Sequence, residues 1–178
     1  LKNNLNKNIK KIYLTASGGP LLNVPFKEFN KLKIKKIVKH PNWSMGKKIS
    51  IDSSTMMNKV YEIIEAKNMF NVDYKNLYIL IHPKSYVHAI VKFKNGLTKI
   101  LIHDTNMKVP IFNSLFNSET HKIYSEKLNI KKLNNLNFNK INIIQFPSLK
   151  IIDLFSSNSN SLLETVLVSA NDELVDLF

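Results

Sequence analysis

Residues 77–103, LYILIHPKSYVHAIVKFKNGLTKILIH, decide the fold class of this chain. Two β-rich runs, 77–82 and 86–94, are followed by Asn95-Gly96 and then by a third apolar run. An Asn-Gly pair between runs of this kind is the strongest short-range signal of a β-hairpin. The middle of the chain is therefore predicted to be an antiparallel or mixed sheet.

An amphipathic helix is predicted before these strands. Apolar residues recur at spacings of three and four from Met56 to Ile64, which is the signature of a helix with one buried face. The pattern ends at about Phe70. Just upstream, Ile49 and Ile51 alternate with polar residues as in a short strand, and residues 52–55 (Asp-Ser-Ser-Thr) are all favourable N-cap residues. We therefore expect the helix to start within 52–55.

Shorter patterns flank this centre. Residues 9–16 form a β-rich run that is closed by Ser17-Gly18-Gly19-Pro20, which predicts a strand leading into a loop of exposed backbone amides. Residues 21–48 are predicted to be a long loop with a short helix near 26–32. Helical patterns are expected at 107–117, 148–155 and 161–178.

These patterns predict the α+β class: a mixed, largely antiparallel sheet packed with helices and followed by helical segments. Residues 1–146 are expected to form the α+β domain, and residues 147–178 its helical continuation. A length of 178 residues is enough for one sizeable core. The chain begins with Leu, from which we expect it to be part of a longer protein.

The composition is strongly basic, but all the basic residues are lysine. There are 26 of them against 13 acidic residues, which gives a formal net charge of +13. Arginine is the residue that binds phosphate and guanine in bidentate fashion, and its absence disfavours nucleic acid as a partner. Lysine-rich runs such as 31–39 are more typical of solvated surfaces.

Cysteine and membrane-spanning segments are both missing from the sequence. Without cysteine the chain has no disulfide, no thiolate metal site and no cysteine nucleophile. No apolar run approaches the roughly 20 residues of a membrane span, so we expect a soluble protein without a membrane partner.

Residues 40–65, HPNWSMGKKISIDSSTMMNKVYEIIE, hold an unusual density of chemically useful side chains. Together with Ser17, they offer the hydroxyls, amide and cation that a phosphate or polyol binder needs, beside a helix start with free backbone donors. Taken singly, a Ser-Gly-Gly-Pro is more often a turn and a Ser-Thr cluster more often a cap. The candidate ligand-binding residues are Ser17, His40, Ser53, Asn58 and Lys59.

Glu62 and Trp43 each allow two interpretations, and two histidines are assigned a structural role. Glu62 shares a helix face with Asn58 and Lys59, so its carboxylate can bind a hard divalent cation or pair with Lys59. Trp43, in a predicted loop, is either a lid over a ligand or an anchor to the core. His82 and His88 lie on predicted strands and are interpreted as structural residues.

Four motifs in combination resemble the 1-deoxy-D-xylulose 5-phosphate reductoisomerase family. They are LTASGGP (14–20), HPNWSMGKKISIDSSTMMNKVYEIIEA (40–66), LIHPKSYVHAIV (80–91) and NMKVPI (106–111). The resemblance runs from about Ile12 to Ile111 and continues more weakly from FPSLK to SANDELVDLF at the end.

The resemblance implies an enzyme of the non-mevalonate isoprenoid pathway. It implies rearrangement and reduction of 1-deoxy-D-xylulose 5-phosphate to 2-C-methyl-D-erythritol 4-phosphate, with NADPH and Mg²⁺ or Mn²⁺ as cofactors. It also implies a homodimer, located in the cytoplasm of a bacterial-type cell or in a plastid-type organelle.

The resemblance also implies roles for individual residues. Ser17, Ser53, Asn58 and Lys59 would hold the substrate phosphate, and His40 would contact the substrate. Catalysis would depend on His40, Lys59 and Glu62, with Glu62 also contacting substrate and acting as a metal ligand. Trp43 and Met45 would form a lid, and Gly46 and Met107 would contact the cofactor.

Several parts of the family pattern have no counterpart in this sequence. These are the Gly-rich turn of the NADPH domain, the Asp-Ser-Glu segment that supplies further metal carboxylates, and the C-terminal helical domain. An Asn-Ala-Ala-Asn-Glu stretch survives only as Val168–Asp172. We therefore expect this polypeptide alone to be inactive; the alternative hypothesis is a non-catalytic, Lys-rich module that binds anions or nucleic acid.

Overall fold

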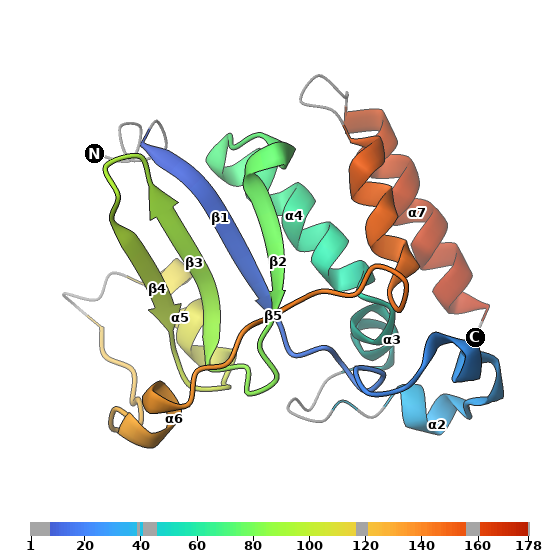
Figure 1. The fold of residues 1–178 in the computed structure, drawn as a ribbon, viewed down its shortest axis with the longest axis horizontal. Coiled ribbons are helices and arrows are strands. Elements are labelled where there is room, and N and C mark those ends of the chain that lie inside the picture. Colours follow the sequence, from blue (N-terminus) through green and yellow to red (C-terminus); the bar gives the residue numbers. More distant parts are fainter. Residues whose placement is uncertain (1–7, 39, 41–45, 117–120, 156–160, 178) are drawn as a thin grey trace.

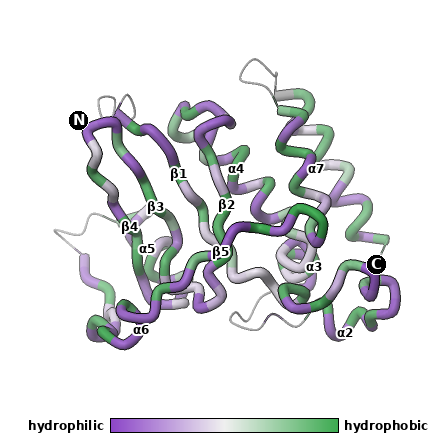
Figure 2. Tube along the Cα trace, viewed as in Figure 1, coloured by the Kyte–Doolittle hydropathy of each residue, from purple (hydrophilic) through white to green (hydrophobic). Residues whose placement is uncertain are grey.

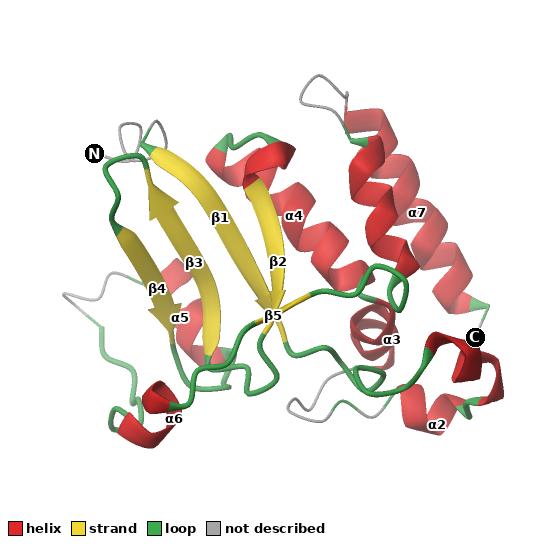
Figure 3. Ribbon diagram, viewed as in Figure 1, coloured by secondary structure: helices red, strands yellow, loops and turns green. Residues whose placement is uncertain are grey.

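The computed structural model describes residues 8–38, 40, 46–116, 121–155 and 161–177. Within these ranges the centre of the fold is a five-stranded sheet with strand order β4-β3-β1-β2-β5 (Figure 3). β1 pairs in parallel with β2, and the other neighbouring strands pair antiparallel. The predicted fold class is therefore confirmed. The strands are β1 (Ile9–Ala16), β2 (Leu77–Ile81), β3 (Val87–Phe93), β4 (Thr98–Ile102) and β5 (Asn139–Lys140).

Helices form in the ranges where the patterns predict them, two of these as 3-10 helices, and further short helices at Ile34–Ile37, Tyr74–Asn76 and Ile130–Asn134 were not predicted. The segment 148–155 is the 3-10 helix η3, because its ends close with i→i+3 backbone bonds. β5 lies in a stretch where no element was predicted. The helices are η1 (Phe26–Lys31), α2 (Ile34–Ile37), α3 (Lys47–Thr55), α4 (Met57–Phe70), η2 (Tyr74–Asn76), α5 (Lys108–Leu115), α6 (Ile130–Asn134), η3 (Pro147–Leu154) and α7 (Ser161–Asp176).

The parallel pairing of β1 with β2 explains where the helices lie. Parallel neighbours cannot be joined by a tight turn and need a long crossover connection. Here the crossover contains α3 and α4, and α4 packs against both strands. In Figure 1, α4 lies behind β2 and α7 runs beside α4. The end of the central strand β1 therefore faces the α3–α4 pair.

One hydrophobic core joins the sheet to α4 and η3. Val60 is completely buried and Ile63 is 1% exposed on the inner face of α4. Figure 2 shows hydrophobic residues along β2 and a mixed pattern along α7. Among the described residues, no helix is both long enough and apolar enough to cross a membrane.

The start of the central helix differs from the prediction. No strand forms at 49–51: α3 begins at Lys47 after Gly46 and ends at Thr55, and the following Met56, with a φ of +64°, separates it from α4. Hydroxyls in α3 bond back to carbonyls of the preceding turn, such as Ser50 Oγ to Gly46 O at 2.9 Å, and so belong to the helix interior. The left-handed residue costs about 1–2 kcal/mol, which burial of the Met56 side chain offsets.

Candidate functional site

A pocket of about 780 Å³ opens between the sheet, α3, α4 and α5. Its walls come from the end of β1, the facing sides of α3 and α4, and the β3–β4 hairpin. Gly46 is exposed and does not line the pocket, while Trp43 and Met45 lie outside the described residues. The other predicted site residues all line it: Ser17, His40, Ser53, Asn58, Lys59, Glu62 and Met107.

The two glycines after β1 allow this strand end to approach α3 closely. Gly18 and Gly19 have φ values of +94° and +62°, and a Cβ on Gly19 would lie 2.6 Å from the carbonyl oxygen of Ser53. Both glycines are buried, so the prediction of a loop of exposed amides is wrong. The Gly19 amide donates to Ser17 Oγ at 3.2 Å. The close backbone contact brings Ser17 and Ser53 to the same pocket.

His40 is connected to this strand end through Ser17. Its Nε2 lies 3.1 Å from Ser17 Oγ. Burial lowers the pKa of His40 below its usual value, because desolvation disfavours the charged imidazole. The neutral ring present at neutral pH can donate or accept a proton or a hydrogen bond in the pocket.

Lys59 and Glu62 form an ion pair on the pocket side of α4. Lys59 Nζ lies 2.7 Å and 2.6 Å from the two carboxylate oxygens of Glu62. The lysine side chain is 11% exposed and that of the glutamate 39%. The ion pair predicted from the spacing of these residues is therefore present, and it places an ammonium and a carboxylate next to each other at the pocket wall.

At the start of α4, the polar groups available to a ligand belong mainly to side chains and not to backbone amides. The Met57 amide donates to Thr55 Oγ1 at 3.4 Å, and the Lys59 amide donates to Met56 O at 3.0 Å. Asn58 Oδ1 is buried without a hydrogen-bond partner among the described residues. The free backbone donors expected at this helix start are therefore largely used, and the Asn58 amide and the Lys59 ammonium are the polar groups that this part of α4 presents to the pocket.

Two histidines line the pocket that the sequence did not assign to it. The rings of His88 and His103 stack with centroids 3.5 Å apart, and both lie in the pocket wall. Burial and then the nearby His103 lower the pKa of His88 to about 4. The pairing register shifts between Val87 and Ala89, and such a bulge re-aims the side chain between them. The regular alternation of side chains along a strand does not predict this change of direction. The sequence signal for the pair was that each strand of the predicted hairpin carries one histidine.

The described residues do not form a complete metal site. No group of three or more His, Cys, Asp or Glu side chains among them is placed to hold a metal ion. Glu62 can contribute one carboxylate, which Lys59 already contacts. Gly19 packs against Ser53 and Gly18 against Leu22, so this turn offers no open backbone cradle for a pyrophosphate. Met107 is 54% exposed at the pocket edge, where a planar ligand can reach it.

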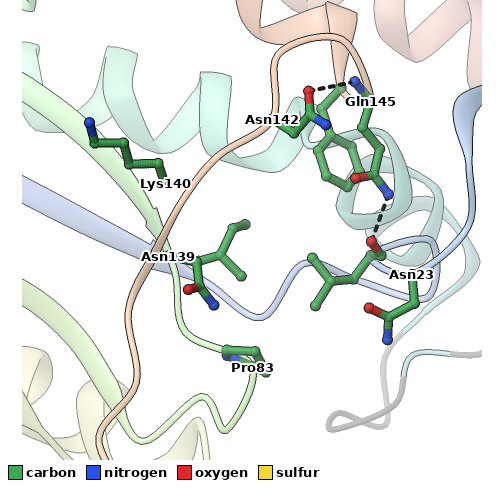
Figure 4. A pocket seen from close by; sticks show the side chains of 9 residues that line it. Asn23, Pro83, Asn139, Lys140, Asn142 and Gln145 are labelled. Atoms are coloured by element: carbon green, nitrogen blue, oxygen red, sulfur yellow. Dashed lines mark hydrogen bonds between the residues drawn. The ribbon is translucent and has the colours of Figure 1, made fainter.

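A second cavity, of about 300 Å³, lies near the end of β2 and beside β5 (Figure 4). Gln145 Nε2 lies within hydrogen-bond distance of the carbonyl oxygens of Leu21, Leu22 and Val24, at 2.7, 2.7 and 3.0 Å. This side chain therefore fixes the loop after β1 to the segment before η3. Its donors are used within the protein, which indicates a structural role.

Fold and site together define an α+β domain with a pocket of hydroxyl, amide, imidazole and ammonium groups at the end of its central strand. Residues 1–70 match the family model of the 1-deoxy-D-xylulose 5-phosphate reductoisomerase C-terminal domain. Residues 103–178 match a second model, the DXP reductoisomerase C-terminal domain. The chain belongs to the 1-deoxy-D-xylulose 5-phosphate reductoisomerase family, as the sequence motifs predict.

Curated relatives agree with these matches over the whole chain. The reductoisomerase of Pelagibacter ubique (strain HTCC1062) is 61% identical over 100% of this chain and 46% of the relative. That of Sulfurihydrogenibium sp. (strain YO3AOP1) is 39% identical over 100% of this chain and 47% of the relative. The chain thus spans about half the length of the curated relatives it matches.

Solved structures of similar proteins have the same fold. A DOX-P reductoisomerase in complex with NADPH, fosmidomycin and magnesium matches with a TM-score of 0.75 and 38% identity, over 85% of this chain and 37% of that chain. The Zymomonas mobilis enzyme in complex with NADPH matches with a TM-score of 0.78 and 26% identity, over 98% of this chain and 50% of that chain.

Proposed function

We propose that this chain forms the substrate pocket of an enzyme that converts 1-deoxy-D-xylulose 5-phosphate to 2-C-methyl-D-erythritol 4-phosphate. The observation that carries the proposal is that Ser17, Ser53, Asn58 and Lys59 line one pocket with His40 in a chain of this family. The reaction moves a carbon–carbon bond within the substrate and then adds hydride to the resulting aldehyde. NADPH, which is bound in two of the similar structures, would supply that hydride.

The phosphate end of the substrate is proposed to bind at the α3–α4 corner. Lys59 would supply a positive charge, and its low exposure strengthens its attraction for a dianion. The hydroxyls of Ser17 and Ser53 and the amide nitrogen of Asn58 would donate hydrogen bonds to phosphate oxygens. His40, neutral through burial, would contact the sugar portion beside Ser17.

Glu62 is proposed as one carboxylate ligand of Mg²⁺ or Mn²⁺, with further oxygen ligands from outside the described residues. Similar enzymes have been solved in complex with magnesium. Because the described residues hold no complete metal site, we expect the 178-residue chain by itself to show no turnover. Met107 and Gly46 are proposed to contact the cofactor, with Trp43 and Met45 as a lid.

The test is an assay of the protein expressed from its complete reading frame. Purified protein with Mn²⁺, NADPH and 1-deoxy-D-xylulose 5-phosphate should consume NADPH and form the branched polyol phosphate, as read by absorbance and mass spectrometry. The matched control omits the sugar phosphate. Absence of substrate-dependent NADPH oxidation in correctly folded, metal-loaded protein would refute the proposed function.

A homodimer in the cytoplasm or a plastid-type organelle is proposed on the same family grounds. β4 supports the dimer, because it is an edge strand of the sheet and because its Ile100 and Leu101 are 47% and 58% exposed. Unpaired edges with apolar side chains are available for association. Sedimentation of the complete protein should give the mass of two chains.

A further inference from the structure

α3 carries Ser53 into the pocket but buries no hydrophobic side chain. Its buried residues are all polar, and Ile49 is 43% exposed. Helices in proteins usually owe their position to an apolar face packed on the core. Because Ile51 is only half-buried, the position of α3 depends largely on polar contacts with its neighbours. The buried residues are Ser50, Asp52, Ser53 and Ser54.

The polar contacts that hold α3 from outside come largely from α7. Asp52 is 2% exposed, and its Oδ1 accepts a hydrogen bond of 2.8 Å from Asn171 Nδ2. Its Oδ2 accepts from Lys48 Nζ at 3.1 Å. Lys48 Nζ also lies 2.8 Å from Asp172 Oδ1, as a charge contact at about half exposure. Figure 1 shows α3 beside the C-terminal part of α7.

We propose that Asn171 and Asp172 are positioning residues for Ser53, and this inference rests on the proposed function of the pocket. A buried carboxylate is stable only while its oxygens have donors, so Asn171 fixes where Asp52 lies. Ser53 follows Asp52 in the same helix turn. Because the Ser53 carbonyl packs against Gly19, a small rotation of α3 changes the direction of the Ser53 hydroxyl in the pocket.

The same helix offers a control anchor that does not contact α3. Glu164 of α7 is 6% exposed and accepts hydrogen bonds from Tyr74 Oη at 2.6 Å, Asn68 Nδ2 at 2.9 Å and Lys67 Nζ at 3.2 Å. These partners lie at the end of α4 and in η2, away from Ser53. Weakening this anchor tests the docking of α7 without removing a contact to α3.

The experiment compares Asn171→Ala, Asp172→Asn and Glu164→Gln in the protein expressed from its complete reading frame. Three quantities are measured: the Kd for inorganic phosphate by calorimetry, and kcat and KM for the sugar phosphate by steady-state kinetics. Asn171→Ala should raise both Kd and KM about fivefold to tenfold, the size expected for the loss of one typical hydrogen bond, with kcat changed less than twofold. Asp172→Asn, at a half-exposed ion pair, should give a smaller rise of about twofold.

The control decides between positioning and general destabilisation. Glu164→Gln should lower the melting temperature while Kd and KM stay within about twofold of the parent protein. If Asn171→Ala fails to fold, Asp172→Asn with Asp172→Glu as its rescue carries the test. Unchanged phosphate affinity in the Asn171 and Asp172 variants, or an equal loss in Glu164→Gln, would overturn the inference. Phosphate binding without sugar-phosphate turnover would instead refute the proposed function and leave the positioning role standing.

Discussion

At the scale of single residues, Glu62 combines two properties that the sequence presented as alternatives. It pairs with Lys59 and also lines the pocket where a metal ligand is proposed. Because its side chain is 39% exposed, its contribution to stability through the ion pair should be small, below about 1 kcal/mol. Loss of a metal ligand has a much larger effect on turnover.

Glu62→Gln tests that difference in the protein from its complete reading frame. We expect turnover at limiting Mn²⁺ to fall at least about tenfold, with the free energy of unfolding changed by less than about 1 kcal/mol. The control is Asp73→Asn, which removes the surface ion pair of Asp73 with Lys75. Equal turnover of the Glu62 variant and the parent protein at limiting Mn²⁺ would exclude the ligand role.

Gly19 allows the backbone after β1 to lie close to Ser53 in the pocket. Gly19→Ala would place a methyl group 2.6 Å from the Ser53 carbonyl oxygen at a φ of +62°. We expect it to lower the free energy of unfolding by about 3 kcal/mol, of which the left-handed backbone accounts for about 1–2 kcal/mol.

Gly96→Ala is the matched control for this substitution. Gly96 has a φ of +90°, but a Cβ there would meet nothing within 4 Å. Its cost should therefore be limited to the backbone, about 1–2 kcal/mol. Urea unfolding measures both values, and equal costs for the two variants would show that the close approach to Ser53 is unimportant.

At the scale of elements, the β3–β4 hairpin predicts a pH dependence of stability. The pKa of His88 is about 4 in the folded protein, against 6.5 for a free histidine. The unfolded chain therefore binds the proton first as the pH falls. The free energy of unfolding should decrease between pH 6.5 and pH 4, by up to about 1.4 kcal/mol per pH unit from this residue.

Chemical denaturation at pH 7 and pH 5 measures this decrease. His88→Gln should reduce the loss of stability between the two pH values, because glutamine does not titrate. His40, whose pKa is also lowered by burial, contributes in the same direction and remains in the variant. A variant that loses as much stability as the parent protein would contradict the assignment of the effect to His88.

The elements differ in how well the sequence predicts them. The hairpin and α4 were predictable because their signals are local: an Asn-Gly turn and an apolar repeat. The start of α3 was not, because a hydroxyl that caps a helix and one that bonds back within it occur in the same sequence pattern. The pocket residues could be named through family motifs, whereas the stacked pair His88 and His103 depends on a bulge that only the three-dimensional register reveals.

At the scale of the whole molecule, the net charge of +13 arises from an excess of lysine over acidic residues, 26 against 13. Lysines such as Lys59 are held by a specific carboxylate, and the chain has no arginine for bidentate contacts with phosphate or guanine. We therefore expect no saturable binding of a labelled DNA duplex at about 0.15 M salt in fluorescence anisotropy, where non-specific binding alone is weak. Tight binding whose logarithm falls steeply with the logarithm of salt concentration would favour the alternative of a nucleic-acid-binding module.

Because α3 is held in place largely by polar contacts, it should open locally more readily than the rest of the domain. A helix without buried apolar side chains can open at a lower free energy than α4, whose Val60 and Ile63 lie in the core. One wall of the pocket is then a local unfolding unit, and the rest of the domain stays folded when it opens. A phosphate that contacts both Ser53 and Lys59 would link α3 to the more stable α4. Bound ligand should then slow amide exchange in α3, while exchange in α4 stays the same.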